Sequence, residues 1–248
     1  MDGISFWIEE TRVKAYEADF AGLWKPAAFL QAMQEAAANH AAALGFGLEQ
    51  MQARDMVWIL SRVLIYFRDY PRMGESVRLR TWPRGVQQKL FFTRDFILTA
   101  GDGRRLAEAT TGWLLVQPER RKILPPSAMG GALPPNSEQA VDELLEKIPI
   151  PAGLEPRGAF SAGYSAVDVM GHANSARYVE WLSDCFPFED YRARRLARLQ
   201  INYSSEVKPG EECQIAAAAL DGGTWVAQGA IQPAGTRAFE AAFTWMEA

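Results

Sequence analysis

The chain has 248 residues, enough for two small domains, and an apolar fraction of 48% suffices to bury a core in each. Its net charge of −4 excludes a general electrostatic attraction to nucleic acid or to anionic membranes. Because no apolar run approaches the roughly 20 residues of a membrane span, and two cysteines make neither a disulfide framework nor a metal site, we expect no membrane span, metal or cofactor.

The first half of the chain predicts a strand, a long helix and then four antiparallel strands. Pro26 suits the first turn of a helix, apolar residues recur after it at helical spacing, and Gly45 ends the run. The run 57–67 is almost continuously apolar, whereas 77–82 alternates with period two. Two further strands are expected at 89–99 and 106–116, with a turn between them.

Residues 125–158 differ in composition, because seven prolines interrupt them and only Ser137–Lys147 resembles a helix. We therefore expect a Pro-rich linker at 125–158 between an N-terminal unit, 1–124, and a C-terminal unit, 159–248.

Segments of the first half recur in the same order in the second half. The matching pairs are the turns around Asp19 and Asp168, the helices that follow them, Phe67–Glu75 with Tyr203–Glu211, and Ala109–Trp113 with Ala241–Trp245. Such repetition predicts two similar units packed together. A long helix wrapped by an antiparallel sheet, twice over, is the hot-dog architecture of the α+β class, in which two tandem units form an intrachain pseudo-dimer.

The repeat provides an internal control for candidate catalytic residues. The equivalent pairs are Asp19 with Asp168, Leu23 with His172, and Tyr70 with Glu206. Since one unit has Leu and Tyr where the other has His and Glu, the fold itself does not require the imidazole or the second carboxylate. Catalysis is therefore predicted in the second unit only.

The stretch Asp168–Tyr178 resembles the Asp-x-x-Gly-His-x-Asn-x-x-x-Tyr signature of hot-dog thioesterases. The whole chain is similar to the double-hot-dog acyl-ACP thioesterases of bacteria and plant plastids. Patches of the first half that match this family in order are Trp58–Arg62, Tyr70–Pro71, Thr81–Pro83, Arg94–Phe96 and Ala109–Trp113. The resemblance implies hydrolysis of fatty acyl-ACP to free fatty acid and holo-ACP, with acyl carrier protein as the partner.

The resemblance also implies roles for single residues. The family's catalytic positions map onto Asp168, His172 and Glu206. Met170 stands where the family usually has Asn, which puts one substrate contact in doubt. Because the family's first unit holds the fatty chain, the implied candidates for the acyl pocket are Trp58, His40 and Phe91.

Thioester hydrolysis needs an activated water and donors for the developing oxyanion. Asp168 or Glu206 can be the general base, and His172 can orient the water or pass a proton to the leaving thiol. Backbone N–H groups near Gly171 and His172 can donate to the oxyanion. Asn174 either caps the following helix or contacts substrate, with both roles left open.

Two alternatives follow from Met170: an acyl-CoA thioesterase, and a non-catalytic acyl-binding protein. Basic clusters at Arg120–Lys122 and Arg192–Arg198 favour the acidic carrier protein over CoA, although each can equally be a solvated surface. Both a monomer and a homodimer are compatible with two units in one chain. Since no secretory signal is visible, we expect a cytoplasmic location.

Overall fold

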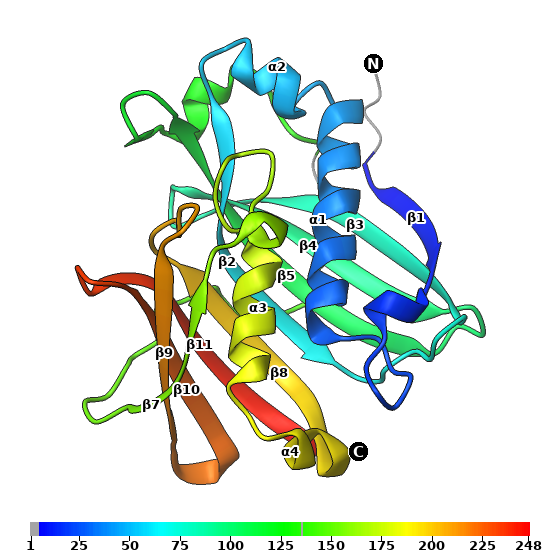
Figure 1. The fold of residues 1–248 in the computed structure, drawn as a ribbon. Helices are drawn as coiled ribbons and strands as arrows, with labels where there is room; N and C mark the ends of the chain where they lie inside the picture. Colours follow the sequence, from blue (N-terminus) through cyan, green and yellow to red (C-terminus); the bar gives the residue numbers. More distant parts are fainter. Residues whose placement is uncertain (1–4, 135) are drawn as a thin grey trace. The chain divides into compact units, whose positions relative to one another are not determined.

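The computed structural model describes residues 5–134 and 136–248 and divides into two compact units (Figure 1). The first covers Met1–Leu145 and the second covers Glu146–Ala248. Residues 1–4 of the expected N-terminal unit and Pro135 of the expected linker lie outside the described residues. Most of the Pro-rich segment 125–158 thus belongs to the first compact unit.

The first unit is a long helix packed on an antiparallel sheet. Its helices are α1 (Pro26–Ala43) and α2 (Leu48–Gln52), with short 3-10 turns η1 (Ala15–Glu17) and η2 (Pro126–Met129). Its strands are β1 (Trp7–Arg12), β2 (Val57–Phe67), β3 (Ser76–Gln87), β4 (Phe91–Ala100), β5 (Arg105–Gln117) and β6 (Lys122–Ile123). The strands pair in the order β1-β3-β4-β5-β2, with β6 beside β5. The predicted helix and the four strands after it are confirmed.

One strand is longer than the sequence indicated. The alternating pattern covered only 77–82, and the next residue, Pro83, lacks the N–H that a strand donates. In the structure β3 continues to Gln87 through a bulge between Pro83 and Gly85. Gly85 has a φ of +133°, which a residue with a side chain rarely adopts, so this glycine allows the strand to pass the proline.

The second unit repeats the first. Its helices are α3 (Ser175–Asp184) and α4 (Phe188–Ala193), with 3-10 turns η3 (Tyr164–Ala166) and η4 (Asp221–Gly223). Its strands are β7 (Glu155–Ser161), β8 (Arg194–Tyr203), β9 (Glu212–Ala219), β10 (Thr224–Ile231) and β11 (Thr236–Glu247). These pair antiparallel in the order β7-β9-β10-β11-β8, the order of their counterparts in the first unit. The predicted repeat is therefore a repeat of topology.

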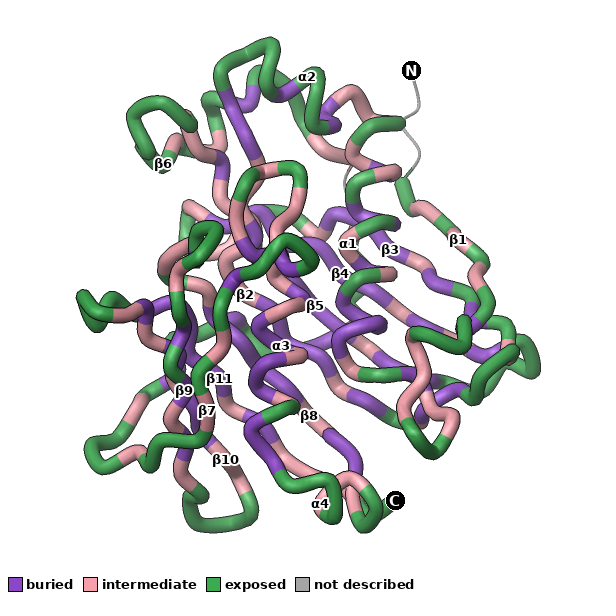
Figure 2. Tube along the Cα trace, viewed as in Figure 1, coloured by how far each residue is buried: buried purple, intermediate pink, exposed green. Residues whose placement is uncertain are grey.

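Each unit buries one face of its long helix against its sheet, as the burial colours show (Figure 2). The buried residues of α1 are Ala27, Ala28, Phe29, Leu30, Met33, Ala36, Ala37 and His40. Those of α3 are Ala176, Tyr178, Val179, Trp181 and Leu182. Full burial of one large apolar side chain contributes about 1.5–3 kcal/mol, so these stripes are a main source of each unit's stability. None of the described helices is both long and apolar enough to cross a bilayer.

The helix-like patch Ser137–Lys147 is not helical in the structure. Side chains of the first unit's sheet bind its backbone instead. Trp82 Nε1 donates to the carbonyl of Glu138 at 2.9 Å, and Arg84 Nη1 donates to that of Val141 at 2.9 Å. The segment therefore obtains from the sheet the hydrogen bonds that a helix would have made internally.

Apolar contacts place this segment on the sheet face opposite the helix. Val141 and Leu145 pack against Leu64 of β2. Phe67, three residues further along β2, contacts Phe29 of α1 with ring centroids 5.2 Å apart. Because side chains alternate along a strand, Leu64 and Phe67 lie on opposite faces. Both faces of the first unit's sheet are thus covered.

Asp95 of β4 is an expected source of pH-dependent stability. Its carboxylate is fully buried, accepts from the Ala140 amide at 2.9 Å, and lies 3.7 Å from Arg84 Nη1. Burial raises the pKa of this carboxyl, although the Ala140 amide opposes the rise. The folded chain therefore binds this proton more tightly than the unfolded chain. The contribution to stability is greatest below the ordinary Asp pKa and is lost as the pH rises through the folded-state pKa.

We expect Asp95→Asn to flatten the decline of the urea midpoint between about pH 4 and 7, because an amide cannot titrate there. The amide oxygen still accepts the Ala140 N–H, so the hydrogen bond of the covering segment is kept. Urea denaturation followed by tryptophan fluorescence at a series of pH values measures this. An unchanged slope in the variant contradicts the assignment to Asp95.

Candidate functional site

The site of the second unit is built on a tight turn between η3 and α3. The Asp168 amide donates to the His172 carbonyl at 3.0 Å, and the Gly171 amide donates to the Asp168 carbonyl at 3.0 Å. Gly171 has a φ of +83°, the left-handed conformation that favours glycine. The Ala173 amide then donates to the carbonyl of Val207 at 2.9 Å, which ties the turn to the loop after β8.

The first unit makes the same bonds at the equivalent positions. The Asp19 amide donates to the Leu23 carbonyl at 2.8 Å, and the Trp24 amide donates to the Pro71 carbonyl at 2.9 Å. Gly22, like its counterpart, has a positive φ, of +75°. Residues that the sequence repeat aligns between the two units therefore make equivalent backbone hydrogen bonds.

Two of the three predicted catalytic residues lie close together, His172 in this turn and Glu206 in the loop after β8. Nε2 of His172 lies 3.3 Å from Oε1 of Glu206. Their side chains are 22% and 31% exposed, so the pair is shielded but still reachable by water and substrate. At this distance the carboxylate oxygen is placed to accept a hydrogen bond from an N–H on the imidazole Nε2.

The third predicted catalytic residue, Asp168, holds the turn. Its Oδ1 accepts from the Met170 amide at 2.9 Å, and its Oδ2 accepts from Asn174 Nδ2 at 3.3 Å. In the first unit, Asp19 Oδ1 accepts from the amides of Ala21 and Leu23 at 2.8 and 3.0 Å. An aspartate that closes a turn in this way is thus common to both units.

Asn174 is the N-cap of α3. Its side-chain oxygen accepts from the Ala176 amide at 2.9 Å, and its Nδ2 holds Asp168. Both ends of the side chain are therefore engaged within the protein. Of the two roles left open by the sequence, the structure places Asn174 in the capping role.

The amides of the turn differ in their availability to an oxyanion. Those of Met170, Gly171 and Ala173 all donate within the protein. The His172 amide has no hydrogen-bond acceptor within 5–134 and 136–248. In the first unit the equivalent amide, that of Leu23, donates to Asp19 Oδ1. The expected oxyanion donor is accordingly the amide of His172.

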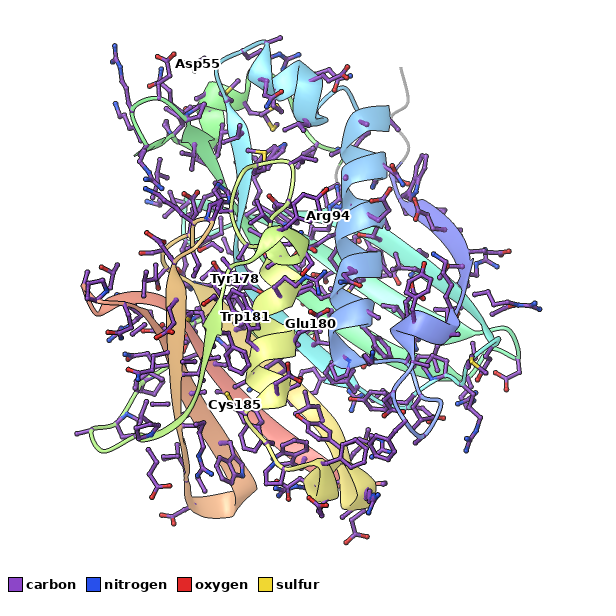
Figure 3. All side chains as sticks on the ribbon, in the orientation of Figure 1. Asp55, Arg94, Tyr178, Glu180, Trp181 and Cys185 are labelled. Carbon is purple, nitrogen blue, oxygen red and sulfur yellow. The ribbon has the colours of Figure 1, made fainter. Side chains whose placement is uncertain are left out.

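Tyr178 lies beside this site and was not among the predicted site residues. It is buried in α3, and its hydroxyl accepts from the Val207 amide at 3.0 Å (Figure 3). Burial raises the pKa of Tyr178 to about 12, and the charges of Glu206 and Asp168 also raise it. The signal that could have identified it is its counterpart Phe29, which lacks the hydroxyl.

The first unit contains an apolar cavity of about 170 Å³. Its walls come from α1, α2, β2, β3, β4, β5 and nearby loops, and include Ala37, Ala41, Met51, Trp58, Phe92 and Trp113. Of the three residues predicted for an acyl pocket, Trp58 lines this cavity. Phe92 and Trp113 share the cavity wall with it.

His40 and Phe91, the other two predicted pocket residues, do not line this cavity. His40 is fully buried, with Nδ1 3.0 Å from Nη1 of Arg94, and its ring stacks on Trp7. Phe91 lies under the guanidinium of Arg62, 4.4 Å from the ring centroid. Phe92 lines the cavity in place of Phe91, because consecutive residues of β4 point to opposite faces of the strand.

Arg94 is a cavity residue that the pocket prediction missed. It lines the apolar cavity, is buried, and donates to Thr81 Oγ1 at 3.3 Å (Figure 3). Burial lowers the pKa of its guanidinium to about 10. The sequence gave no sign that Arg94, a charged residue that precedes an aspartate, would lie at an apolar cavity.

The two basic clusters differ in the structure. Arg194 pairs with Asp190 at 2.9 Å and stacks on Trp245, and Arg195 is buried. The charges of this cluster are therefore largely used within the second unit. Arg120–Lys122, by contrast, is exposed at the turn between β5 and β6.

The two cysteines lie in the interior of the second unit. Cys185 and Cys213 are free and buried, and burial raises the pKa of these thiols to about 11 and about 12. No group of three or more potential metal ligands gathers within the part of the chain that the structure describes.

Comparison with known proteins agrees with the division of the chain into two domains. Residues 6–126 match the acyl-ACP thioesterase N-terminal domain, and residues 155–247 match the acyl-ACP thioesterase C-terminal domain. An acyl-[acyl-carrier-protein] hydrolase of Cuphea viscosissima, FATB3, is 24% identical over 84% of this chain and 53% of its own length. A dodecanoyl-[acyl-carrier-protein] hydrolase of Cinnamomum camphora is 24% identical over 78% of this chain and 54% of its own. The chain thus spans about half the length of these relatives.

Solved structures show the fold. An acyl-ACP thioesterase from Bacteroides thetaiotaomicron has a TM-score of 0.83 at 23% identity, covering 99% of this chain and 100% of that one. A 12:0-ACP thioesterase from Umbellularia californica has a TM-score of 0.83 at 21% identity, covering 98% of both chains. The predicted fold, two tandem hot-dog units of the α+β class, is confirmed. With both of its domains matched over most of the sequence, the chain belongs to the acyl-ACP thioesterase family.

Proposed function

We propose that this protein hydrolyses fatty acyl-ACP to a free fatty acid and holo-ACP, using the His172–Glu206 pair of the second unit. The observation that carries the proposal is that this pair, 3.3 Å apart, replaces Leu23 and Tyr70 on an otherwise equivalent backbone. Family membership and the names of the relatives support this reaction type and this carrier. The expected cytoplasmic location stays a prediction.

In the proposed reaction, His172 and Glu206 act as a unit. With the imidazole proton on Nε2 donating to Glu206, Nδ1 accepts a proton from the attacking water. The water oxygen bonds to the thioester carbon, and the His172 amide donates to the oxyanion that develops there. The C–S bond then breaks, and the imidazolium returns the proton to the leaving thiolate. One water is consumed, and a carboxylic acid and a thiol are formed.

Asp168 supports this pair through the backbone. Its bonds to the Met170 amide and to Asn174 fix the turn that carries His172. Because Asp19 also accepts from turn amides in a unit without this pair, we assign the general-base function to the His172–Glu206 pair and turn geometry to Asp168.

An acyl-CoA thioesterase is the second candidate, and Met170 is the residue that favours it over the family's usual reaction. A non-catalytic acyl-binding protein is a third, and it predicts ligand binding without any release of thiol. The experiments below distinguish the three.

Glu206→Gln is expected to lower kcat on acyl-ACP by about 10²–10⁴-fold, because a neutral amide neither stabilises the imidazolium nor shares its proton. Glutamine keeps the size and an acceptor oxygen, so the thermal midpoint of unfolding is expected to stay within about 3 °C of wild type. Thiol release from acyl-ACPs of graded chain length measures the effect.

The matched control is Glu180→Gln, which changes a carboxylate of α3 that pairs with Arg177 and not with His172. Wild-type turnover is expected there. Wild-type protein that releases no thiol from acyl-ACP or acyl-CoA of any length, yet binds fatty acid, points to the non-catalytic candidate and overturns the proposal.

The carrier is tested at the exposed basic turn. Exchanging Arg120 and Lys122 for Glu together is expected to raise KM for acyl-ACP about tenfold at low salt, since complementary charge speeds encounter with an acidic carrier. KM for the same acyl group on CoA is expected to change much less. The equivalent exchange of Arg194 is a poor test, because its charge already pairs with Asp190. Equal effects on the two carriers contradict docking of the carrier protein at this turn.

The cavity of the first unit is proposed to hold the acyl chain. Ala37→Leu adds bulk to its wall and is expected to lower kcat/KM for the longest accepted acyl chain about tenfold, with little effect on short chains. The control is Ala43→Leu, at the exposed end of the same helix. A uniform loss over all chain lengths contradicts a chain-holding cavity.

A further inference from the structure

Tyr178 contacts the backbone of the residue next to Glu206. Its hydroxyl accepts from the Val207 N–H at 3.0 Å, and Val207 is fully buried. The Val207 nitrogen belongs to the peptide plane that starts at the carbonyl carbon of Glu206, and this plane is rigid. The bond to Tyr178 therefore fixes the orientation in which the chain leaves Glu206.

The other side of Val207 is fixed as well. Its carbonyl accepts from the Ala173 amide at 2.9 Å. Val207 is thus clamped at its N–H by α3 and at its carbonyl by the turn before α3. With both bonds made, Glu206 is held toward His172, 3.3 Å away.

Packing holds the Tyr178 ring so that its hydroxyl reaches this point. Its ring centroid lies 5.3 Å from that of Trp181, 5.4 Å from Tyr203 and 5.6 Å from Phe239 (Figure 3). Phe239 fits there because its neighbour on β10 is Gly229, where a Cβ would come within 2.2 Å of the Phe239 ring. The position of the hydroxyl is therefore set by the core of the second unit.

The first unit shows that the fold does not need this bond. Phe29 occupies the position of Tyr178 and contacts Phe67 edge to face at 5.2 Å, as Tyr178 contacts Tyr203. Pro71, which accepts from Trp24, occupies the position of Val207. Phenylalanine has no hydroxyl and proline has no N–H, so both partners of the bond are missing together.

We propose that the Tyr178 hydroxyl is a positioning group for Glu206, acting through the Val207 amide. The inference rests on the proposed function, in which Glu206 and His172 form the catalytic pair. The bond occurs in the unit that carries this pair, and in the other unit Tyr70 stands at the position of Glu206. Because the pKa of Tyr178 is raised to about 12, the hydroxyl is neutral at physiological pH and adds no charge beside Glu206.

The first test is Tyr178→Phe in the full chain. The Val207 N–H then loses its acceptor, and the Glu206–Val207 peptide is freed to rotate. A displacement of about 1 Å at a catalytic group lowers turnover about 10- to 100-fold, so we expect a fall of this size in kcat with KM for acyl-ACP within about twofold of wild type.

The matched control is Tyr203→Phe. It removes the hydroxyl of the neighbouring aromatic ring. This hydroxyl donates to the Ser175 carbonyl at 2.9 Å and makes no bond to Val207. Turnover within about twofold of wild type is expected.

A double variant separates positioning from simple stability. Tyr178→Phe combined with Val207→Pro recreates the Phe–Pro combination of the first unit and leaves no buried N–H without an acceptor. We expect it to recover the thermal stability that Tyr178→Phe loses, while kcat stays low. If turnover returns together with stability, the hydroxyl is only structural and the proposal is overturned.

A readout independent of activity is the ¹H–¹³C NMR signal of the His172 imidazole, which a His172→Gln variant identifies among the chain's two histidines. We expect this signal to shift in Tyr178→Phe and in Glu206→Gln, and to stay unchanged in Tyr203→Phe. An unchanged signal in Tyr178→Phe overturns the positioning role even if the wild-type protein hydrolyses acyl-ACP. Conversely, a wild-type protein without activity contradicts the proposed function, while the NMR signal still decides the role of Tyr178.

Discussion

One backbone hydrogen bond determines what the site can be. The Ala173 amide donates to the Val207 carbonyl, and this bond joins the turn before α3 to the loop after β8. Because each bonded residue directly follows a site residue, the bond brings His172 and Glu206 into reach of each other. The equivalent residues of the first unit are Trp24, Pro71, Leu23 and Tyr70. The scaffold therefore brings two positions close together in each unit, and only in the second unit do they carry an imidazole and a carboxylate, the pair to which we assign proton transfer.

The comparison of the two units indicates a structural role for Asp168, the aspartate of the motif. Asp168 is a prominent residue of the motif, yet Asp19 accepts the same kind of turn hydrogen bond in a unit without the catalytic pair. Asx turns of this kind satisfy backbone amides that would otherwise be unpaired next to a helix start. What distinguishes Asp168 is its second hydrogen bond, to Asn174. The first unit has a lysine, Lys25, at the position of Asn174. In the second unit the Asp168 carboxylate accepts from the Met170 amide, whereas Asp19 Oδ1 accepts from both turn amides, Ala21 and Leu23.

The fold was predictable from the sequence to a large extent, and the site in part. Hydrophobic periodicity located α1 and β2, and the repeat gave the equivalence of His172 with Leu23, because these signals are local or internal to the chain. The non-helical course of Ser137–Lys147 was not predictable, since its hydrogen bonds go to Trp82 and Arg84, more than 50 residues earlier in the sequence. The same applies to the cavity. Whether Phe91 or Phe92 faces it depends on which face of β4 the helix covers, and the run of apolar residues there does not reveal the face.

Met170 is best understood by the same comparison of units. Its backbone amide, and not its side chain, binds Asp168, and Ala21 does the same for Asp19. The turn therefore accepts methionine, alanine or asparagine at this position without losing its hydrogen bonds. The departure from the family's asparagine consequently leaves the scaffold and the His172–Glu206 contact intact, and any effect falls on the contact with substrate. Because the turn uses only the backbone at this position, its side chain can vary without disturbing the turn hydrogen bonds.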